Sequence, residues 1–255
     1  MTSTQLDHVR VLDVPVHRLT SDQVVETIMQ WTSLPGLRVA VGVNAAVCNL
    51  AAEDRAFRAS LMRADLRYPD GQSIVWAARL LGAGLPERIA TTDLVNPLAA
   101  VSAQRGKRIF LYGSAPGVAE RAAARLRESA PGLLIDGRDG YTAPEQVRHI
   151  IDQINAFSPD ILFVGLGDPL QEHWIDAHRH ELNVPVILTC GGLFDWASGD
   201  NPRAPRWMLS SGLEWLWRLM LEPGRLASRY LIGNPVFLYR LARQLVNRRA
   251  RAIPS

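Results

Sequence analysis

Two short apolar runs, residues 161–164 and 184–188, each lead directly into a glycine-containing turn and then a helical segment. Apolar runs of this length bounded by glycines are typical of buried strands in a parallel sheet. The segments that follow carry Gln171, Glu172 and Asp195, polar residues that a core would not need. Because ligands of open α/β sheets bind beyond the carboxyl ends of the strands, this pattern predicts a ligand site there.

The chain up to about residue 200 continues the same alternation of strand and helix. Further strands are expected at 39–43, 66–68, 108–112 and 133–136. Helices are expected at 45–61, 73–81, 93–104, 118–130 and 144–157, with Asn44 and Thr142 as N-caps of the first and last. The alternation predicts a doubly wound α/β fold with a mostly parallel sheet.

Composition limits the classes of protein that remain. A chain of 255 residues with 47% hydrophobic and 21% charged residues can bury a sizeable core. Cys48 and Cys190 lie too far apart for a disulfide framework or a cysteine zinc site. No apolar run reaches the roughly 18 residues of a membrane span, and the N-terminus lacks a signal-peptide pattern, so we expect a cytoplasmic protein.

The charge is concentrated at the C-terminus. From residue 201 onward ten arginines face only Glu214 and Glu222, a balance of +8, so the net +3 of the chain leaves −5 on residues 1–200. Helices are expected at 205–221 and 224–251, broken by Pro223 and by Gly233-Asn234-Pro235.

These C-terminal arginines alternate with leucine and aromatic residues, a pattern typical of a helix lying in a membrane interface. The alternative is a helical appendage with a solvated basic face. We therefore divide the chain into an α/β body, residues 1–200, and a basic helical appendage, residues 201–255, that meets an anionic partner.

Two glycine-containing turns have both a functional and a structural interpretation. Asp70, at the end of the strand 66–68, is placed to act as a general base, although Asp-Gly is also ordinary turn chemistry. On the residues alone the turn or cap is favoured. The loop that begins at Gly113 is either a phosphate cradle at a helix N-terminus or a tight turn.

Other motifs point away from a metal. His173, His178 and His180 do not have the spacing of a zinc motif, and the strand ends carry no DxD-like sequence. Gln171 and Asp195 have the donors and acceptors to bind a sugar hydroxyl, a ribose or a base. We therefore predict neither a metal nor a cofactor.

A series of motifs occurs in one order along the chain. They are Asn44, Tyr68-Pro69-Asp70-Gly71, Glu87-Arg88, Thr92-Asp93-Leu94, Val164-Gly165-Leu166-Gly167, Gly191-Gly192, Gly212-Leu213-Glu214-Trp215, Glu222-Pro223 and Gly233-Asn234-Pro235. By these motifs the sequence resembles the WecG/TagA/CpsF glycosyltransferase family, from about residue 11 to about residue 245.

The resemblance implies an inverting, metal-independent transferase. It would move N-acetylmannosamine, its uronic acid or glucose from a UDP-sugar to a polyprenyl-diphosphate-linked saccharide in cell-wall or exopolysaccharide synthesis. The enzyme would be peripheral on the cytoplasmic face of the membrane. The oligomeric state stays open, with a homo-oligomer as one alternative.

The resemblance also assigns site residues. Asp70 matches the catalytic base, which reverses the preference for a turn, and Asn44 matches a second catalytic-site residue. The expected UDP-sugar site contains Gln171, Asp195, Gly113 and Gly165. The residues expected to meet the diphosphate and the membrane are Arg218 and Arg225, and Arg229 is a local candidate for the same role.

Two positions depart from the family pattern. Gly42 stands where members commonly have threonine, and Thr91 stands where they commonly have glycine. The loss of a hydroxyl at position 42 leaves the sugar specificity open. The alternative function is a non-catalytic nucleotide- or nucleic-acid-binding α/β module whose basic tail binds phosphates. A Rossmann dehydrogenase is disfavoured because the G-x-G-x-x-G fingerprint is missing.

Overall fold

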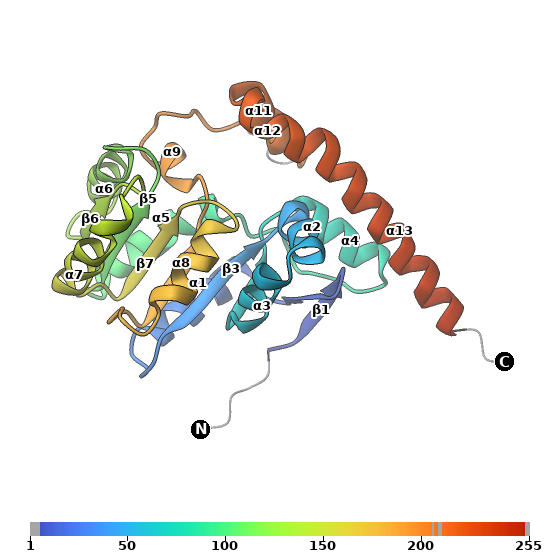
Figure 1. The fold of residues 1–255 in the computed structure, drawn as a ribbon, viewed down its shortest axis with the longest axis horizontal. Coiled ribbons are helices and arrows are strands. Elements are labelled where there is room, and N and C mark those ends of the chain that lie inside the picture. Colours follow the sequence, from blue (N-terminus) through green and yellow to red (C-terminus); the bar gives the residue numbers. More distant parts are fainter. Residues whose placement is uncertain (1–5, 206, 209–210, 253–255) are drawn as a thin grey trace.

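The computed structural model describes residues 6–205, 207–208 and 211–252, and of Arg225 and residues 249–252 it describes the backbone alone (Figure 1). Its centre is a parallel six-stranded sheet in the order β4-β3-β8-β7-β5-β6. The predicted strands and the doubly wound α/β fold are confirmed. The strands are β3 (Arg38–Val43), β4 (Leu66–Pro69), β5 (Arg108–Gly113), β6 (Leu134–Arg138), β7 (Ile161–Gly165) and β8 (Val186–Thr189).

The sheet is buried on both faces because alternate side chains of its strands enter two separate cores. In β7, Leu162 and Val164 pack into one core, and Ile161 and Phe163 pack into the other. This explains why the central strands are continuous apolar runs in the sequence.

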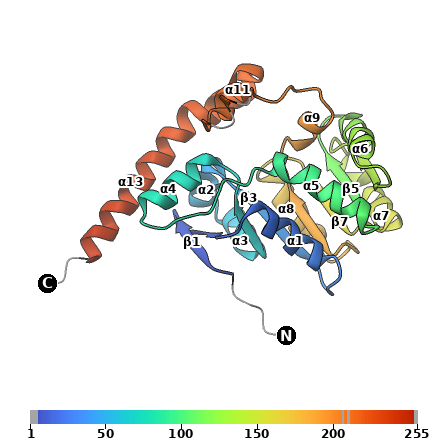
Figure 2. The ribbon, with the colours of Figure 1, turned by 180° about the vertical axis from the view of Figure 1, so that it is seen from behind.

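Helices cover both faces of the sheet, as the two opposite views show (Figures 1 and 2). The first core contains residues of α2 (Ala45–Glu53), α3 (Arg55–Arg63), α4 (Gln72–Leu80), α7 (Val147–Phe157) and α8 (Leu170–His178). The second contains residues of α1 (Ser21–Trp31), α5 (Thr91–Gln104), α6 (Val118–Ser129) and α9 (Leu193–Ala197).

The N-terminal segment forms elements that the sequence analysis did not predict. β1 (His8–Val11) and β2 (Val14–His17) pair antiparallel through a two-residue turn, and α1 follows. Leu12 and Asp13 in the turn have φ values of 48° and 64°. The sequence gives little indication of this hairpin, because neither turn residue is the glycine that such turns favour.

Two helix predictions were wrong in detail. The expected helix 45–61 is interrupted at Asp54, whose side chain caps α3 by accepting the N–H groups of Ala56 and Phe57. Thr142 is not an N-cap: a 3₁₀ turn, η1 (Pro144–Gln146), precedes α7, and neither segment has a side-chain cap. The Asp54 cap, rather than apolar spacing, determined the first of these boundaries.

The C-terminal part is a chain of helices. α11 (Glu214–Leu221) is followed by α12 (Pro223–Ala227), the π-helical turn η2 (Ser228–Ile232) and α13 (Gly233–Ala252). The break at Pro223 is confirmed, but the break predicted at Gly233-Asn234-Pro235 is wrong, because the helical backbone continues without a gap from η2 into α13. Proline is tolerated in a first helical turn, where its missing N–H is not needed.

The first C-terminal helix is also shorter than the expected range 205–221. The segment around Gly212 is a turn with a φ of +71°, and α11 starts only at Glu214. Residues 206, 209 and 210 of the predicted helix lie outside the described part of the chain.

The long helix α13 is anchored to the α/β body along one side. Phe237 and Leu241 are 2% and 3% exposed and belong to the core beneath α2. Arg240 donates to Asn49 Oδ1 at 3.0 Å and pairs with Glu53 at 2.8 Å. The division at residue 200 stays a prediction. None of the described helices has the length and apolar character needed to cross a membrane.

Candidate active site

A cavity of about 440 Å³ opens where the carboxyl ends of β3, β4, β7 and β8 meet the C-terminal helices. The site predicted at this edge of the sheet therefore coincides with a real hollow in the molecule. Polar residues from both parts of the chain line it, namely Asn44, Asp70, Arg88, Asp168, Gln171, Arg218 and Arg229.

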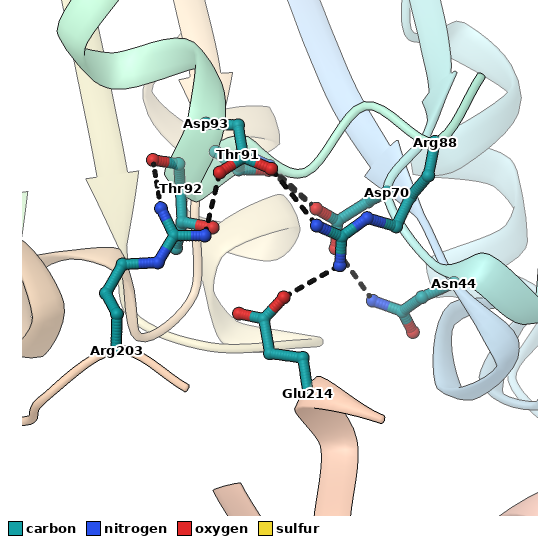
Figure 3. Close-up of polar contacts among 8 residues, drawn as sticks. All are labelled: Asn44, Asp70, Arg88, Thr91, Thr92, Asp93, Arg203 and Glu214. Carbon is teal, nitrogen blue, oxygen red and sulfur yellow. Dashed lines mark hydrogen bonds and ion pairs between the residues drawn. The ribbon is translucent and has the colours of Figure 1, made fainter. Parts of the chain in front are cut away.

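Asp70 follows directly after β4, and its carboxylate is held by the start of α5. Oδ1 accepts the Thr91 N–H at 2.8 Å and the Thr91 hydroxyl at 3.2 Å, and Oδ2 accepts from Asn44 Nδ2 at 3.4 Å (Figure 3). The side chain does not cap α4, because the N-cap of that helix is Gly71 with no side-chain bond. One oxygen is therefore firmly oriented, and the other is only weakly bound at the cavity.

Asn44 is the N-cap of α2, as predicted. Its Oδ1 accepts the N–H groups of Ala46 and Val47 at 3.0 and 3.2 Å, and Arg229 Nη2 donates to the same oxygen at 3.3 Å. Because the capping bonds fix the amide, its Nδ2 is aimed at Asp70.

The C-terminal part brings arginines over the strand ends. Arg229, on η2, lies 4.0 Å from the carboxylate of Asp168, and Arg218, on α11, stacks over the Trp196 ring at 5.1 Å. Both line the cavity. Arg225 is on α12, but its side chain lies outside the described part of the chain. The cavity thus combines a carboxylate with cations able to meet an anion.

A buried polar cluster forms the β7 side of the cavity. Gln171 Nε2 donates to Asp168 Oδ1 at 2.6 Å and to Glu172 Oε1 at 2.9 Å, and Gln171 Oε1 accepts the Gly191 N–H at 3.1 Å. Asp168 does not cap the following helix, because Pro169 is the N-cap and makes no side-chain bond. Gln171 is therefore rigidly held between two strand ends.

The pKa values of the two carboxyl groups of this cluster are raised. Burial raises the pKa of Asp168, although Arg229 opposes the effect. Burial, and then the charge of Asp168, raise the pKa of Glu172 to about 8. Glu172 therefore holds a proton at neutral pH.

Glu172→Gln is expected to stabilise the fold increasingly as the pH rises from about 5 to 8. The pKa of Glu172 is about 8 in the folded state against 4.5 ordinarily, so unfolding releases a proton and the free energy of unfolding falls across this window. Glutamine has no such proton to lose. Urea denaturation should show a difference growing by on the order of 2 kcal/mol. The exposed Glu128→Gln is the control, and a pH-independent difference would contradict the assignment.

An ion-pair network links the C-terminal part to the cavity edge. Arg88 pairs with Glu214 at 2.7 Å and with Asp93 at 3.1 Å, and Arg203 pairs with Asp93 at 2.7 Å (Figure 3). Arg88 and Glu214 both belong to the ordered sequence motifs, but no role was predicted for either. Their opposite charges could have suggested an ion pair. The two residues are 126 positions apart in the sequence, however, so nothing local indicated that they meet.

Three predicted site residues lie elsewhere at the same edge. Gly113 and Gly165 are paired neighbours at the ends of β5 and β7, where a Cβ on Gly165 would come within 2.8 Å of the Gly191 carbonyl oxygen. Asp195 is on α9. The pKa of Cys190 is raised mainly by burial and, to a smaller extent, by the charge of Asp195. These three are not among the described residues that line the cavity, and their place in a nucleotide site stays a prediction.

Comparison with known proteins identifies the family. A model described as "Glycosyl transferase WecG/TagA/CpsF family" matches residues 9–251. The chain belongs to this family. It is therefore an enzyme, a glycosyltransferase, and the non-catalytic alternative is set aside.

Relatives of this glycosyltransferase carry a specific name. A Bacillus spizizenii protein is 38% identical over 176 residues, covering 69% of this chain and 68% of the relative. A Staphylococcus aureus protein is 28% identical over 238 residues, covering 92% of each chain. Both are named N-acetylglucosaminyldiphosphoundecaprenol N-acetyl-beta-D-mannosaminyltransferase.

Proposed function

We propose that this glycosyltransferase moves N-acetylmannosamine from its UDP derivative to an undecaprenyl-diphosphate-linked N-acetylglucosamine, with inversion and without a metal ion. The names of the relatives support the sugar and the acceptor. The observation that carries the proposal is the juxtaposition, in one cavity, of the Asp70 carboxylate with Arg229 and Arg218.

The reaction follows from this juxtaposition. The acceptor hydroxyl attacks the anomeric carbon of the donor, and its proton passes to Asp70 Oδ2. The bond between the anomeric carbon and the diphosphate oxygen breaks, and UDP leaves with that electron pair. Arg229 and Arg218 stabilise the charge that develops on the diphosphate, in a site partly shielded from water.

The two sides of the cavity suit the two substrates. Gln171, locked between Asp168 and Gly191, offers a fixed amide to the donor on the side of β7 and β8. Asp195 and Gly165 lie at the same strand ends and would extend the nucleotide site. The acceptor would approach Asp70 from the side of β4 and α4.

The acceptor side of the cavity has an apolar wall. Trp76 and Leu80 on α4 are 49% and 62% exposed, and Leu238 on α13 is 61% exposed. These side chains would contact the first isoprene units of the acceptor. Beyond them Tyr239 and Val246 on α13 are exposed at a seven-residue spacing, which places them along one side of that helix, and Ile232 at the end of η2 is exposed as well. This stripe would rest on the membrane that holds the lipid tail.

Tyr239→Glu combined with Val246→Glu is expected to weaken binding to liposomes of anionic phospholipid by at least about tenfold, because two exposed apolar side chains become charged. Co-sedimentation measures the effect. Leu34→Glu is the matched control, since Leu34 is 45% exposed and lies in the turn after α1. Unchanged co-sedimentation of the double variant would show that this stripe does not meet the membrane.

The activity itself is tested by UDP release. Purified protein is incubated, first without and then with EDTA, with a panel of UDP-sugars and a short-chain prenyl-diphosphate-linked N-acetylglucosamine. We expect release that needs both substrates and is fastest with UDP-N-acetylmannosamine. Faster release with its uronic acid or with UDP-glucose would correct the sugar, and release that stops when EDTA is added would contradict a metal-independent reaction.

A further inference from the structure

The carboxylate of Asp70 is the end point of a chain of buried hydroxyl groups. Thr91 is the first residue of α5, and both its N–H and its hydroxyl donate to Asp70 Oδ1. The Thr91 hydroxyl also lies 2.8 Å from the hydroxyl of Tyr68, which is fully buried. Tyr68 is two residues before Asp70 and points into the core rather than into the cavity.

Hydrogen-bond chemistry gives this chain a single direction. An ionised carboxylate only accepts, so the one proton of the Thr91 hydroxyl is donated to Asp70. The oxygen of Thr91 must then accept from Tyr68. Burial raises the pKa of Tyr68 further above its ordinary value, so the phenol keeps the proton that it donates. Tyr68 therefore orients Thr91, and Thr91 orients Asp70.

Gly42 supplies the space that this arrangement needs. It is the β3 partner of Tyr68 in the sheet. A Cβ at position 42 would lie 2.9 Å from Asp70 Cβ and 3.1 Å from Thr91 Oγ1. Both distances are tighter than ordinary van der Waals contact, so a side chain at position 42 and the Thr91 hydroxyl compete for the same volume.

We propose that Thr91 is a positioning residue for the catalytic base, and that its hydroxyl occupies the place that a side chain at position 42 would otherwise take. The proposal rests on Asp70 being the base. Positions 42 and 91 are therefore expected to be coupled.

Thr91→Val, which keeps the shape and removes the hydroxyl, tests the positioning role. We expect kcat to fall on the order of tenfold, since a hydrogen bond to a charged group is lost, with the donor KM unchanged. The unfolding midpoint should fall as well, because the buried Tyr68 hydroxyl loses its acceptor. Thr91→Ser should restore kcat to within about threefold because it keeps the donor group. Tyr68→Phe should give a smaller loss, since it removes only the group that orients Thr91.

Thr32→Val is the matched control. Thr32 follows α1, and its buried hydroxyl donates to the Met29 carbonyl at 2.7 Å, outside the described cavity lining. Its loss should leave kcat unchanged. An equal loss of kcat in Thr32→Val and Thr91→Val, or in Thr91→Ser and Thr91→Val, would overturn the proposal, because the effect would then not come from the bond to Asp70.

The coupling between positions 42 and 91 is tested by Gly42→Thr alone and by Gly42→Thr together with Thr91→Gly. Gly42→Thr alone should lower kcat strongly, because its side chain meets both Thr91 and Asp70. The double variant should be several-fold more active than Gly42→Thr, since it removes one contact and returns a hydroxyl from β3. Losses that simply multiply would show that the positions act independently and would overturn the coupling.

Asp70→Asn, assayed in parallel, separates this inference from the proposed function. If Asp70→Asn retains turnover, the base is misassigned and the proposed mechanism fails. If Asp70→Asn is inactive while Thr91→Val has full kcat, the mechanism stands and only the positioning role of Thr91 is wrong.

Discussion

Asp70→Asn is expected to lower kcat by about a hundredfold to ten-thousandfold, the usual contribution of a general base. Asparagine keeps the size of the side chain and can still accept from Thr91, but it cannot take a proton. Binding of UDP, measured by calorimetry, should be unchanged because the Asp70 carboxylate faces the acceptor rather than the diphosphate. The assay is UDP release with both substrates at saturation.

Asp54→Asn is the control for this replacement. Asp54 caps α3 through Ala56 and Phe57, and asparagine caps helices equally well, so activity and stability should both be retained. Turnover of Asp70→Asn within tenfold of the original protein would remove Asp70 from the mechanism. Loss of UDP binding in the same variant would instead show that the carboxylate helps to shape the donor site.

Arg229→Gln is expected to lower kcat by about a hundredfold to a thousandfold, comparable to removing one donor from an oxyanion hole. The side chain reaches the cavity from η2 and contacts Asn44 and, at 4.0 Å, Asp168. Bound diphosphate would draw the guanidinium away from these partners. The donor KM should rise less than kcat falls, because the charge on the leaving group is greatest in the transition state.

Two further variants make this result specific. Arg229→Lys should recover part of the activity, since it keeps a charge but loses the two-pronged geometry suited to a phosphate. Arg243→Gln should have full activity in detergent solution, because Arg243 lies on α13 over the Tyr239 ring and outside the described cavity lining. An active Arg229→Gln would shift the leaving-group role to Arg218 or Arg225.

The sheet could be predicted closely because its signal is local. A strand buried on both faces must be a continuous apolar run, and β5 and β7 are such runs. The hairpin β1–β2 lacked a comparable signal, because its turn has no glycine. The boundary between α2 and α3 depended on a single capping side chain, Asp54, inside a longer apolar pattern.

The candidate site was only partly predictable. Asp70, Asn44 and Gln171 were expected at strand ends, and the structure places all three at one cavity. The roles of Thr91 and Glu214 were not expected. Each acts on a residue distant in the chain: Thr91 bonds to Asp70, and Glu214 pairs with Arg88.

The sequence alone determined the class of fold, the edge of the sheet where the cavity opens, and the family. These follow from residue types at short spacings, which are set by the local geometry of strands, turns and caps. Only the tertiary structure decided which side chains meet in the cavity, that Gly42 makes room for Thr91, and that Arg229 reaches across to Asn44. Those contacts depend on how distant segments pack, and spacing along a chain does not specify that packing.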